Sequence, residues 1–271
     1  MKLTNKIKSI TIGSFDGIHL GHQVLINQAQ AVVVIERNSG YLTPGYRRIN
    51  YLKKPCFFYH FEKISQLSAK EFIDRVCIDF PKVETIVVGY DFEFGHKKEG
   101  NTALLKELFY GEVIVVDEVK VDNISVHSRA IIEYLKEGNL FLVNRLLGRP
   151  FSVDGEVILG QGLGKRELVP TINLSVYDYW LPKNGVYITR TKIDNKWLDS
   201  ISFVGIRQTT DNSFAVETHI IGKLLGEVKG NVSVAFLEPI RGNIKFNSIK
   251  ELKNQINLDI TYAKNYFKDS R

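Results

Sequence analysis

Continuous runs of apolar, mostly β-branched residues recur through the first 120 residues of this 271-residue chain. Such runs are typical of strands that are buried on both faces of a parallel sheet. Segments with helical spacing lie between them, and the helix expected after Ser68 has the capping-box partner Glu71 three positions on. This alternation predicts a doubly wound α/β domain. The expected strands are residues 7–12, 31–35, 85–88 and 113–116.

The pattern changes at Gly148-Arg149-Pro150, which ends a helical stretch expected over 126–147 and marks a domain boundary. Short alternating runs separated by turn residues then follow, and they indicate a compact antiparallel barrel. We therefore expect two domains, residues 1–148 and 149–271. The expected barrel strands are 155–159, 186–193, 197–204, 214–221 and 232–237, and a last helix spans about 248–267.

Composition excludes several classes of protein. Hydrophobic residues make up 44% and charged residues 24% of the chain, as in soluble globular proteins, and no apolar window approaches a membrane span. The start of the chain lacks a signal core, so we expect a cytoplasmic protein without membrane contact. The net charge of +6 includes no dense Lys/Arg run, which argues against nucleic-acid binding but suits polyphosphate ligands. Cys56 and Cys77 lack the Cys-x-x-Cys spacing of a metal site.

The segment GSFDGIHLGH at 13–22 follows the first expected strand and leads into a helix that ends near Ala29. His19 and His22 stand at the start of that helix, where main-chain N–H groups are free and the helix dipole is positive. A phosphate is favoured at such a place, and glycines let the main chain approach it closely. The segment therefore suggests nucleoside triphosphate chemistry, although two histidines three apart also fit a capped, solvated helix start.

Two further segments carry groups that suit phosphates. Alternating glycines next to a lysine can form a flexible main-chain cradle for an anion, although an ordinary hairpin turn has the same composition. On an extended segment, Thr171 and Asn173 point the same way, and their oxygens suit Mg²⁺ that bridges to phosphates. The alternative is a turn after Pro170 with self-bonded polar side chains. The glycines and the lysine of the first segment are Gly160, Gly162, Gly164 and Lys165.

Glu217 interrupts an otherwise apolar β-run, FAVETHII at 214–221. A carboxylate in such a strand faces either solvent or a site, and the residues alone favour solvent. If it faces a site, it can accept a proton from an attacking hydroxyl.

Several of these motifs together resemble the prokaryotic bifunctional riboflavin kinase/FAD synthetase family over nearly the whole chain. The resemblance implies an N-terminal Rossmann-like nucleotidyltransferase domain and a C-terminal six-stranded β-barrel flavokinase domain with a final helix. It also moves the expectation for Glu217 from solvent to a site. The matching strings are GSFDGIHLGHQ at 13–23, VGYDFEFG at 88–95 with Gly100, LGRPF at 147–151, PTINL at 170–174, LPKNGVY at 181–187, VETH at 216–219, Arg241 with Lys245-Phe246, and Gln255-Ile256 with Asp259.

For the second domain, the resemblance implies phosphorylation of the riboflavin ribityl 5′-hydroxyl by ATP, which gives FMN. Glu217 would be the general base, and Thr171 and Asn173 would hold Mg²⁺ against the β- and γ-phosphates. Arg207 and Arg241 would contact the flavin. The nucleotide would be lined by Gly160, Gly162, Gly164 and Lys165.

For the first domain, the resemblance implies transfer of AMP from ATP to FMN, which gives FAD and pyrophosphate. His19 and His22 would steady the triphosphate at the α-phosphorus. We expect only small-molecule partners and a monomer or weak homo-oligomer. Other nucleotide-binding residues would be Gly13, Phe15, Asn101, Ser128 and Arg129, and flavin-binding residues would be Asp91, Phe92 and Phe94.

Departures from the family pattern lie mainly in the first domain. The Ser/Thr-rich motif that ends in Arg is degenerate at 126–132, where Ile132 replaces the Arg, and the usual Phe-Glu-Pro-His-Pro run is missing near Glu36. Asn101 stands where an acidic residue is usual. A riboflavin kinase with a weakened or inactive adenylyltransferase domain is therefore an alternative. A flavin- or nucleotide-sensing module without turnover is a third, which the combination of Glu217 with the Thr–Asn pair argues against.

Overall fold

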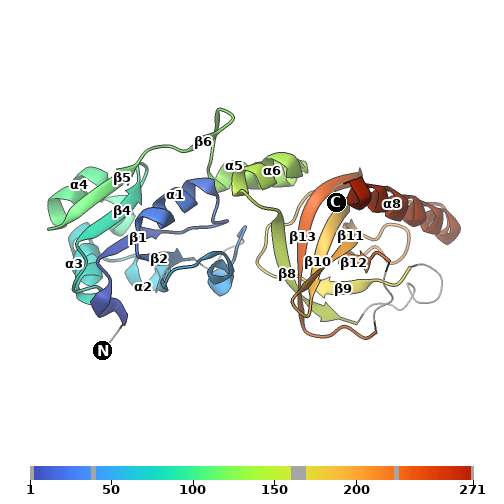
Figure 1. The fold of residues 1–271 in the computed structure, drawn as a ribbon, viewed down its shortest axis with the longest axis horizontal. Helices are drawn as coiled ribbons and strands as arrows, with labels where there is room; N and C mark the ends of the chain where they lie inside the picture. The colour runs from blue at the N-terminus through green and yellow to red at the C-terminus, as the bar shows by residue number, and fades with distance from the viewer. Residues whose placement is uncertain (1–2, 38–40, 160–168, 223–225, 270–271) are drawn as a thin grey trace. The chain divides into compact units, whose positions relative to one another are not determined.

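Contacts divide the molecule into two compact units, Met1–Ala130 and Ile131–Arg271. Each unit has its own sheet, as the ribbon in Figure 1 shows. Each unit also has its own hydrophobic core. The computed structural model describes residues 3–37, 41–159, 169–222 and 226–269.

The described strands of the first unit include a parallel sheet of five in the order β3-β2-β1-β4-β5. Every neighbouring pair is parallel, which confirms the expected doubly wound sheet. Strand β3 was not among the strands expected from the sequence. The strands are β1 (Ser9–Gly13), β2 (Ala31–Glu36), β3 (Cys56–His60), β4 (Thr85–Gly89) and β5 (Glu112–Val116).

Apolar side chains cover both faces of this sheet, because successive residues of a strand point to opposite sides. Val33 packs in a core with Phe72 of helix α3, whereas Val32 and Val34 pack with residues such as Ile26 of helix α1. The expected capping box of Ser68 with Glu71 begins α3 and is confirmed. The helices and 3-10 turns of this unit are η1 (Leu3–Lys6), α1 (Leu20–Gln28), η2 (Gly45–Tyr51), α2 (Phe61–Ile64), α3 (Ala69–Asp79), η3 (His96–Lys98) and α4 (Thr102–Leu108).

A small hairpin and two helices follow the sheet. The expected single helix over 126–147 is wrong, because the structure has two helices with a break at Gly138. Gly138 has a φ of 86°, and the Asn139 side chain then accepts the Leu142 N–H at 3.2 Å to begin the second helix. Gly148, with a φ of 70°, ends it as expected. These elements are β6 (Lys120–Val121), β7 (Ile124–Ser125), α5 (Ser128–Glu137) and α6 (Leu140–Leu147).

The described strands of the second unit close into an antiparallel barrel of six in the order β10-β11-β12-β9-β8-β13, which confirms the expected barrel. The final helix is also confirmed, and it packs Ala263 and Phe267 against Ile188 and Ile201 of the barrel wall. The elements are β8 (Phe151–Ile158), β9 (Ile172–Ser175), β10 (Gly185–Ile193), β11 (Lys196–Ile206), β12 (Phe214–Ile220), β13 (Asn231–Gly242) and α8 (Ile249–Asp269).

Asn144 ties helix α6 to the barrel. Its Nδ2 donates to the carbonyls of Phe236 and Leu237 in β13, at 3.0 and 3.3 Å. Its Oδ1 accepts the main-chain N–H of Phe151 in β8 at 2.7 Å. One side chain in the helix thus satisfies polar groups of the first and last barrel strands.

Five hydroxyl groups in the second unit form a closed cycle, here called the hydroxyl ring. Thr189 contacts Ser200 and Ser202 at 2.8 Å each, and Thr191 contacts Ser200 at 2.8 Å. Thr218 closes the cycle, 3.0 Å from Thr191 and 2.9 Å from Ser202. All five residues are fully buried. The ring therefore links β10, β11 and β12 through side chains as well as through the main chain.

Among the described residues, no helix combines the length and the apolar character needed to cross a membrane.

Replacing Thr218 by valine keeps the β-branched shape but opens the hydroxyl ring, and Thr191 and Ser202 each lose a buried partner. We expect the second unit to lose about 2 kcal/mol of unfolding free energy, since each buried polar group without its partner costs about 1–3 kcal/mol. Urea unfolding followed by tryptophan fluorescence measures this unit, because both tryptophans, Trp180 and Trp197, belong to it.

Thr261→Val is the control, since Thr261 is exposed on α8 and bonds only within its own helix. Equal losses in the two variants would contradict a stabilising role for the ring.

Candidate functional site

His19 and His22 lie together at the start of α1, after the carboxyl end of β1. The Nδ1 of His19 accepts the main-chain N–H of His22 at 3.2 Å, so His19 is the N-cap of the helix. Because this Nδ1 accepts, the proton of a neutral His19 is on Nε2. The two imidazole rings stack with centroids 3.5 Å apart and planes 17° apart. The sequence-based placement of both histidines at a helix N-terminus is confirmed.

Close packing fixes the loop that carries these histidines. The Phe15 ring is 1% exposed and meets the His22 ring edge-on at 5.2 Å. A Cβ at Gly13 would lie 3.3 Å from the Phe15 ring, and a Cβ at Gly21 would lie 3.2 Å from the His19 ring. Phe15 and Ile18 have φ values of 48° and 43°, which are strained for residues with side chains. Strain of this kind is often found at functional sites.

Ser128 also contacts this loop. Its hydroxyl donates to the main-chain carbonyl of Asp16 at 2.8 Å. The Asp16 carboxylate accepts the N–H groups of Leu42 and Thr43 at 3.2 and 2.9 Å, and burial raises its pKa above the usual value. The structure thus brings Ser128 to the motif, whereas Arg129, the next residue, is exposed.

Arg48 lies near the carboxyl end of β2 and was not predicted as a functional residue from the sequence. Its side chain is fully buried, forms an ion pair with Glu36, and donates to the Gly45 carbonyl at 3.1 Å. Its Nε and Nη2 have no hydrogen-bond partner among the described residues. Burial raises the pKa of Glu36 above its usual value, and the neighbouring Arg48 guanidinium offsets only part of this rise. The one sequence feature that pointed to this place was the shortened segment after the second strand, which contains Glu36, the partner of Arg48.

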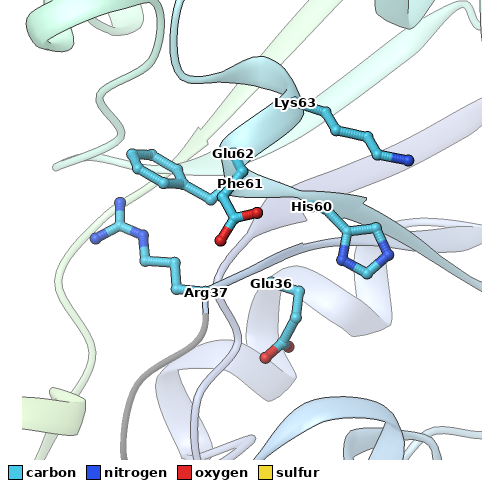
Figure 2. Close-up of a pocket in the computed structure, with 6 residues that line it drawn as sticks. All are labelled: Glu36, Arg37, His60, Phe61, Glu62 and Lys63. Carbon is cyan, nitrogen blue, oxygen red and sulfur yellow. The ribbon is translucent and has the colours of Figure 1, made fainter.

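A polar pocket of about 440 Å³ lies where β2 and β3 end (Figure 2). The Arg37 guanidinium lies over the Phe61 ring, 4.6 Å from its centroid. In this view, the Glu62 carboxylate lies between Arg37 and His60. Parallel sheets bind ligands at the carboxyl ends of their strands, and the pocket and the histidine motif share that edge. The lining residues are Glu36, Arg37, His60, Phe61, Glu62 and Lys63.

The loop after β4 lies at the same edge, because β4 pairs with β1. Asp91 is exposed, and Phe92 stacks on Phe94 with ring centroids 5.4 Å apart. Phe94 is only 5% exposed and belongs to the core with Phe72, which favours a structural role for it. Asn101 caps α4 by accepting two main-chain N–H groups at 3.0 Å each. The binding roles of these four predicted residues stay predictions.

In the second unit, Glu217 of β12 stands directly opposite Asn173 of β9 in the antiparallel ladder. Directly opposed residues share a face of the sheet, with their Cβ atoms about 5 Å apart. Thr171 immediately precedes β9. It is two residues from Asn173, so in an extended segment its side chain points to the same face as that of Asn173. The structure therefore brings the acid close to the Thr–Asn pair.

Glu217 is partly buried and paired with Arg207. Both side chains are 20% exposed, and Arg207 Nη1 lies 2.8 Å from Glu217 Oε1. Burial raises the pKa of Glu217 above its usual value, and the Arg207 guanidinium offsets only part of this rise. Arg207 Nη2 also donates to Ser213 Oγ at 2.6 Å and to Asp211 Oδ2 at 3.2 Å. The loop between β11 and β12 therefore holds a cation against the carboxylate.

Arg241 makes a different contact from the flavin contact that the resemblance implied. Its Nε and Nη2 donate to the Asp259 carboxylate at 3.0 and 2.8 Å, and Asp259 is 2% exposed. Gln255 also donates to Asp259, at 2.9 Å. The pair joins β13 to α8. The flavin roles of Arg241 and Arg207 stay predictions, and Gly160, Gly162, Gly164 and Lys165 lie outside the described residues.

The donor set around Glu217 fits a hard cation held mainly by phosphates. Mg²⁺ prefers oxygen ligands and is bound in such sites by one or two protein groups together with substrate phosphates and water. Thr171 and Asn173 offer a hydroxyl and an amide oxygen, and neither side chain has a recorded hydrogen bond within the described residues. Among the residues that the structure describes, no three or more His, Cys, Asp or Glu side chains lie close enough together to hold a metal ion by themselves.

Two family models match the chain. One described as FAD synthetase matches residues 2–43 and 31–130, and one described as riboflavin kinase matches residues 147–267. The first match covers the parallel sheet with its helices, and the second covers the barrel and α8.

Whole-length relatives agree with these models. The bifunctional riboflavin kinase/FMN adenylyltransferase of Buchnera aphidicola subsp. Schizaphis graminum is 32% identical over 98% of this chain and 96% of its own length. The Escherichia coli K12 protein of the same name is 28% identical over 95% and 92%. A crystal structure of a macrolide-efflux protein from Streptococcus pneumoniae has a TM-score of 0.84 and 26% identity over 98% of both chains. The chain belongs to the family of bifunctional riboflavin kinase/FMN adenylyltransferases.

Proposed function

We propose that this chain is an enzyme with two activities, riboflavin kinase in residues 149–271 and FMN adenylyltransferase in residues 1–148. ATP and riboflavin are the substrates of the first reaction, and ATP and FMN are those of the second. The observation that carries the proposal is the placement of Glu217 opposite Asn173 and close to Thr171. The enzyme is cytoplasmic, acts as a monomer or weak homo-oligomer, and uses no nucleic acid.

In the kinase reaction, Glu217 accepts the proton of the riboflavin 5′-hydroxyl while that oxygen attacks the γ-phosphorus of ATP. The bond between the γ-phosphorus and the bridging β-oxygen breaks, and ADP leaves with the electron pair. Thr171 and Asn173 would hold Mg²⁺, which would supply positive charge to neutralise the phosphates of ATP. Burial raises the pKa of Glu217, and the Arg207 guanidinium offsets part of this effect, which favours the carboxylate form that accepts the proton.

In the adenylyl transfer, an FMN phosphate oxygen attacks the α-phosphorus of ATP, and pyrophosphate leaves. FMN phosphate is already ionised at neutral pH, so this reaction needs no general base. What it needs is positioning and stabilisation of negative charge. His19 and His22, at the positive end of α1, supply both for the triphosphate. Gly13 and Gly21 allow the tight packing of the loop that holds them.

Glu217→Gln tests the kinase assignment, because it keeps the shape of the side chain but cannot accept the proton. We expect FMN formation from riboflavin and ATP to fall roughly 10²–10⁴-fold, with riboflavin affinity nearly unchanged. Chromatographic product analysis measures the rate, and fluorescence titration measures the affinity. Glu156→Gln, at an exposed carboxylate in strand β8, is the matched control. Near-normal turnover in Glu217→Gln would remove the base assignment.

His22→Ala separates the two activities. We expect FAD formation from FMN and ATP to drop by about 10²-fold or more, while FMN formation stays within twofold, because the two reactions use different residues. The released pyrophosphate is measured alongside FAD, and His96→Ala is the control in the same unit. If both rates fall together, the two-site assignment fails. Absence of FAD with the unaltered protein would favour a kinase-only enzyme.

Arg207→Gln removes the cation beside Glu217 while its burial remains. We expect the pKa of the Glu217 carboxyl to rise further, because the guanidinium is what lowers it. The carboxylate then takes up its proton at higher pH, and the acid limb of FMN formation moves to higher pH. Carboxyl ¹³C NMR titration measures the pKa, with Glu217→Gln identifying the signal. Arg190→Gln, at an exposed pair with Asp199, is the control, and an unmoved titration in Arg207→Gln would contradict the assignment.

A further inference from the structure

His219 lies two residues after Glu217 on strand β12, so both side chains belong to the same face of the sheet. The residue between them, Thr218, points to the other face and joins the hydroxyl ring. The Nδ1 of His219 lies 2.8 Å from the main-chain carbonyl oxygen of Pro170. Because a carbonyl oxygen only accepts, Nδ1 must carry the proton in this contact.

This hydrogen bond holds the chain at the point where it enters β9. The recorded pairing of β12 with β9 runs from Val216 to Thr218 and stops opposite Ile172. Thr171 therefore lies beyond the last pair of that ladder. The hydrogen bond from His219 to Pro170 continues the contact between β12 and the segment before β9, and it holds the chain at the residue before Thr171.

The carbonyl of Pro170 belongs to the same planar peptide unit as the nitrogen of Thr171. Fixing this carbonyl orients the whole peptide plane from which the Thr171 side chain departs. Pro170 has no N–H to make a compensating main-chain bond, so its carbonyl is the one polar group of the residue that can anchor it. The His219 bond thus limits where the Thr171 hydroxyl can lie relative to Asn173 and Glu217.

We propose that His219 is a positioning residue of the kinase site, which holds Thr171 in place to bind magnesium together with Asn173. The inference rests on the proposed function, because it assigns a partner to the residues proposed to hold the metal. His219 touches neither substrate nor metal in this role. It acts through the Pro170 carbonyl, in the way that partners behind a metal ligand fix the ligand's orientation.

The test compares His219→Asn with His219→Gln. The Asn side chain carries its N–H₂ at the same branch position as the His Nδ1, so it can still donate to Pro170, whereas the Gln amide lies one atom further out. The readout is calorimetric binding of ADP by the full chain, measured without metal and over a series of Mg²⁺ concentrations. This readout does not depend on turnover.

We expect His219→Gln to raise the Mg²⁺ concentration that gives half of the metal-dependent gain in ADP affinity by roughly 10-fold or more. His219→Asn should stay within about threefold of the unaltered protein, and metal-free ADP binding should be the same in all three proteins. Tryptophan fluorescence unfolding checks that the variants fold, and a His219→Ala variant should resemble His219→Gln.

Equal Mg²⁺ dependence in all variants would overturn the proposal, and so would an equal defect in Asn and Gln. A loss of ADP binding that is the same with and without metal would also overturn it, since that result indicates a general structural role. Failure of the proposed function is a different result: the unaltered protein would form no FMN, although the Mg²⁺ dependence of ADP binding still distinguished His219→Asn from His219→Gln.

Discussion

The hydroxyl ring fixes the strand on which the proposed kinase chemistry depends. Buried hydroxyl groups are costly unless each finds a partner, and a one-residue slip of β12 would turn Thr218 out of the ring and break two of its five contacts. The same strand carries Glu217 on its other face. The buried contacts of Thr218 therefore fix Glu217 as the residue opposite Asn173, and the geometry of the proposed kinase site follows from this register.

The sites that we propose for phosphates differ in construction between the two units. The first uses the start of a helix, with a histidine as its cap and strained, tightly packed residues around it. The second uses opposed strands that carry oxygen ligands and a carboxylate, with Arg207 setting the charge balance. A helix end offers fixed main-chain donors, whereas a sheet face offers side chains that can include a proton acceptor.

Apolar periodicity predicted the two architectures, because it is a local signal. For Glu217 the residues alone favoured solvent, and only the resemblance to a known family placed it at a site near the Thr–Asn pair. Contacts made between distant segments were not predicted from the sequence. Arg48 gives no sign of burial until Glu36 is seen beside it, and the Ser and Thr residues of the hydroxyl ring look like ordinary strand residues. The break at Gly138 was overlooked because the apolar spacing continues across it. Roles such as those of Arg241 depend on bound substrate, and its contact with Asp259 is not encoded in any short motif.

The bridge from Asn144 to both ends of the barrel bears on how the second unit can be produced alone. A fragment that starts at the Gly148-Arg149-Pro150 junction keeps every barrel strand but loses this side chain, and two carbonyls and one amide are then left without it. A fragment that begins upstream of Leu140 keeps α6 together with these strands, and we expect it to be more stable than one that begins at the junction.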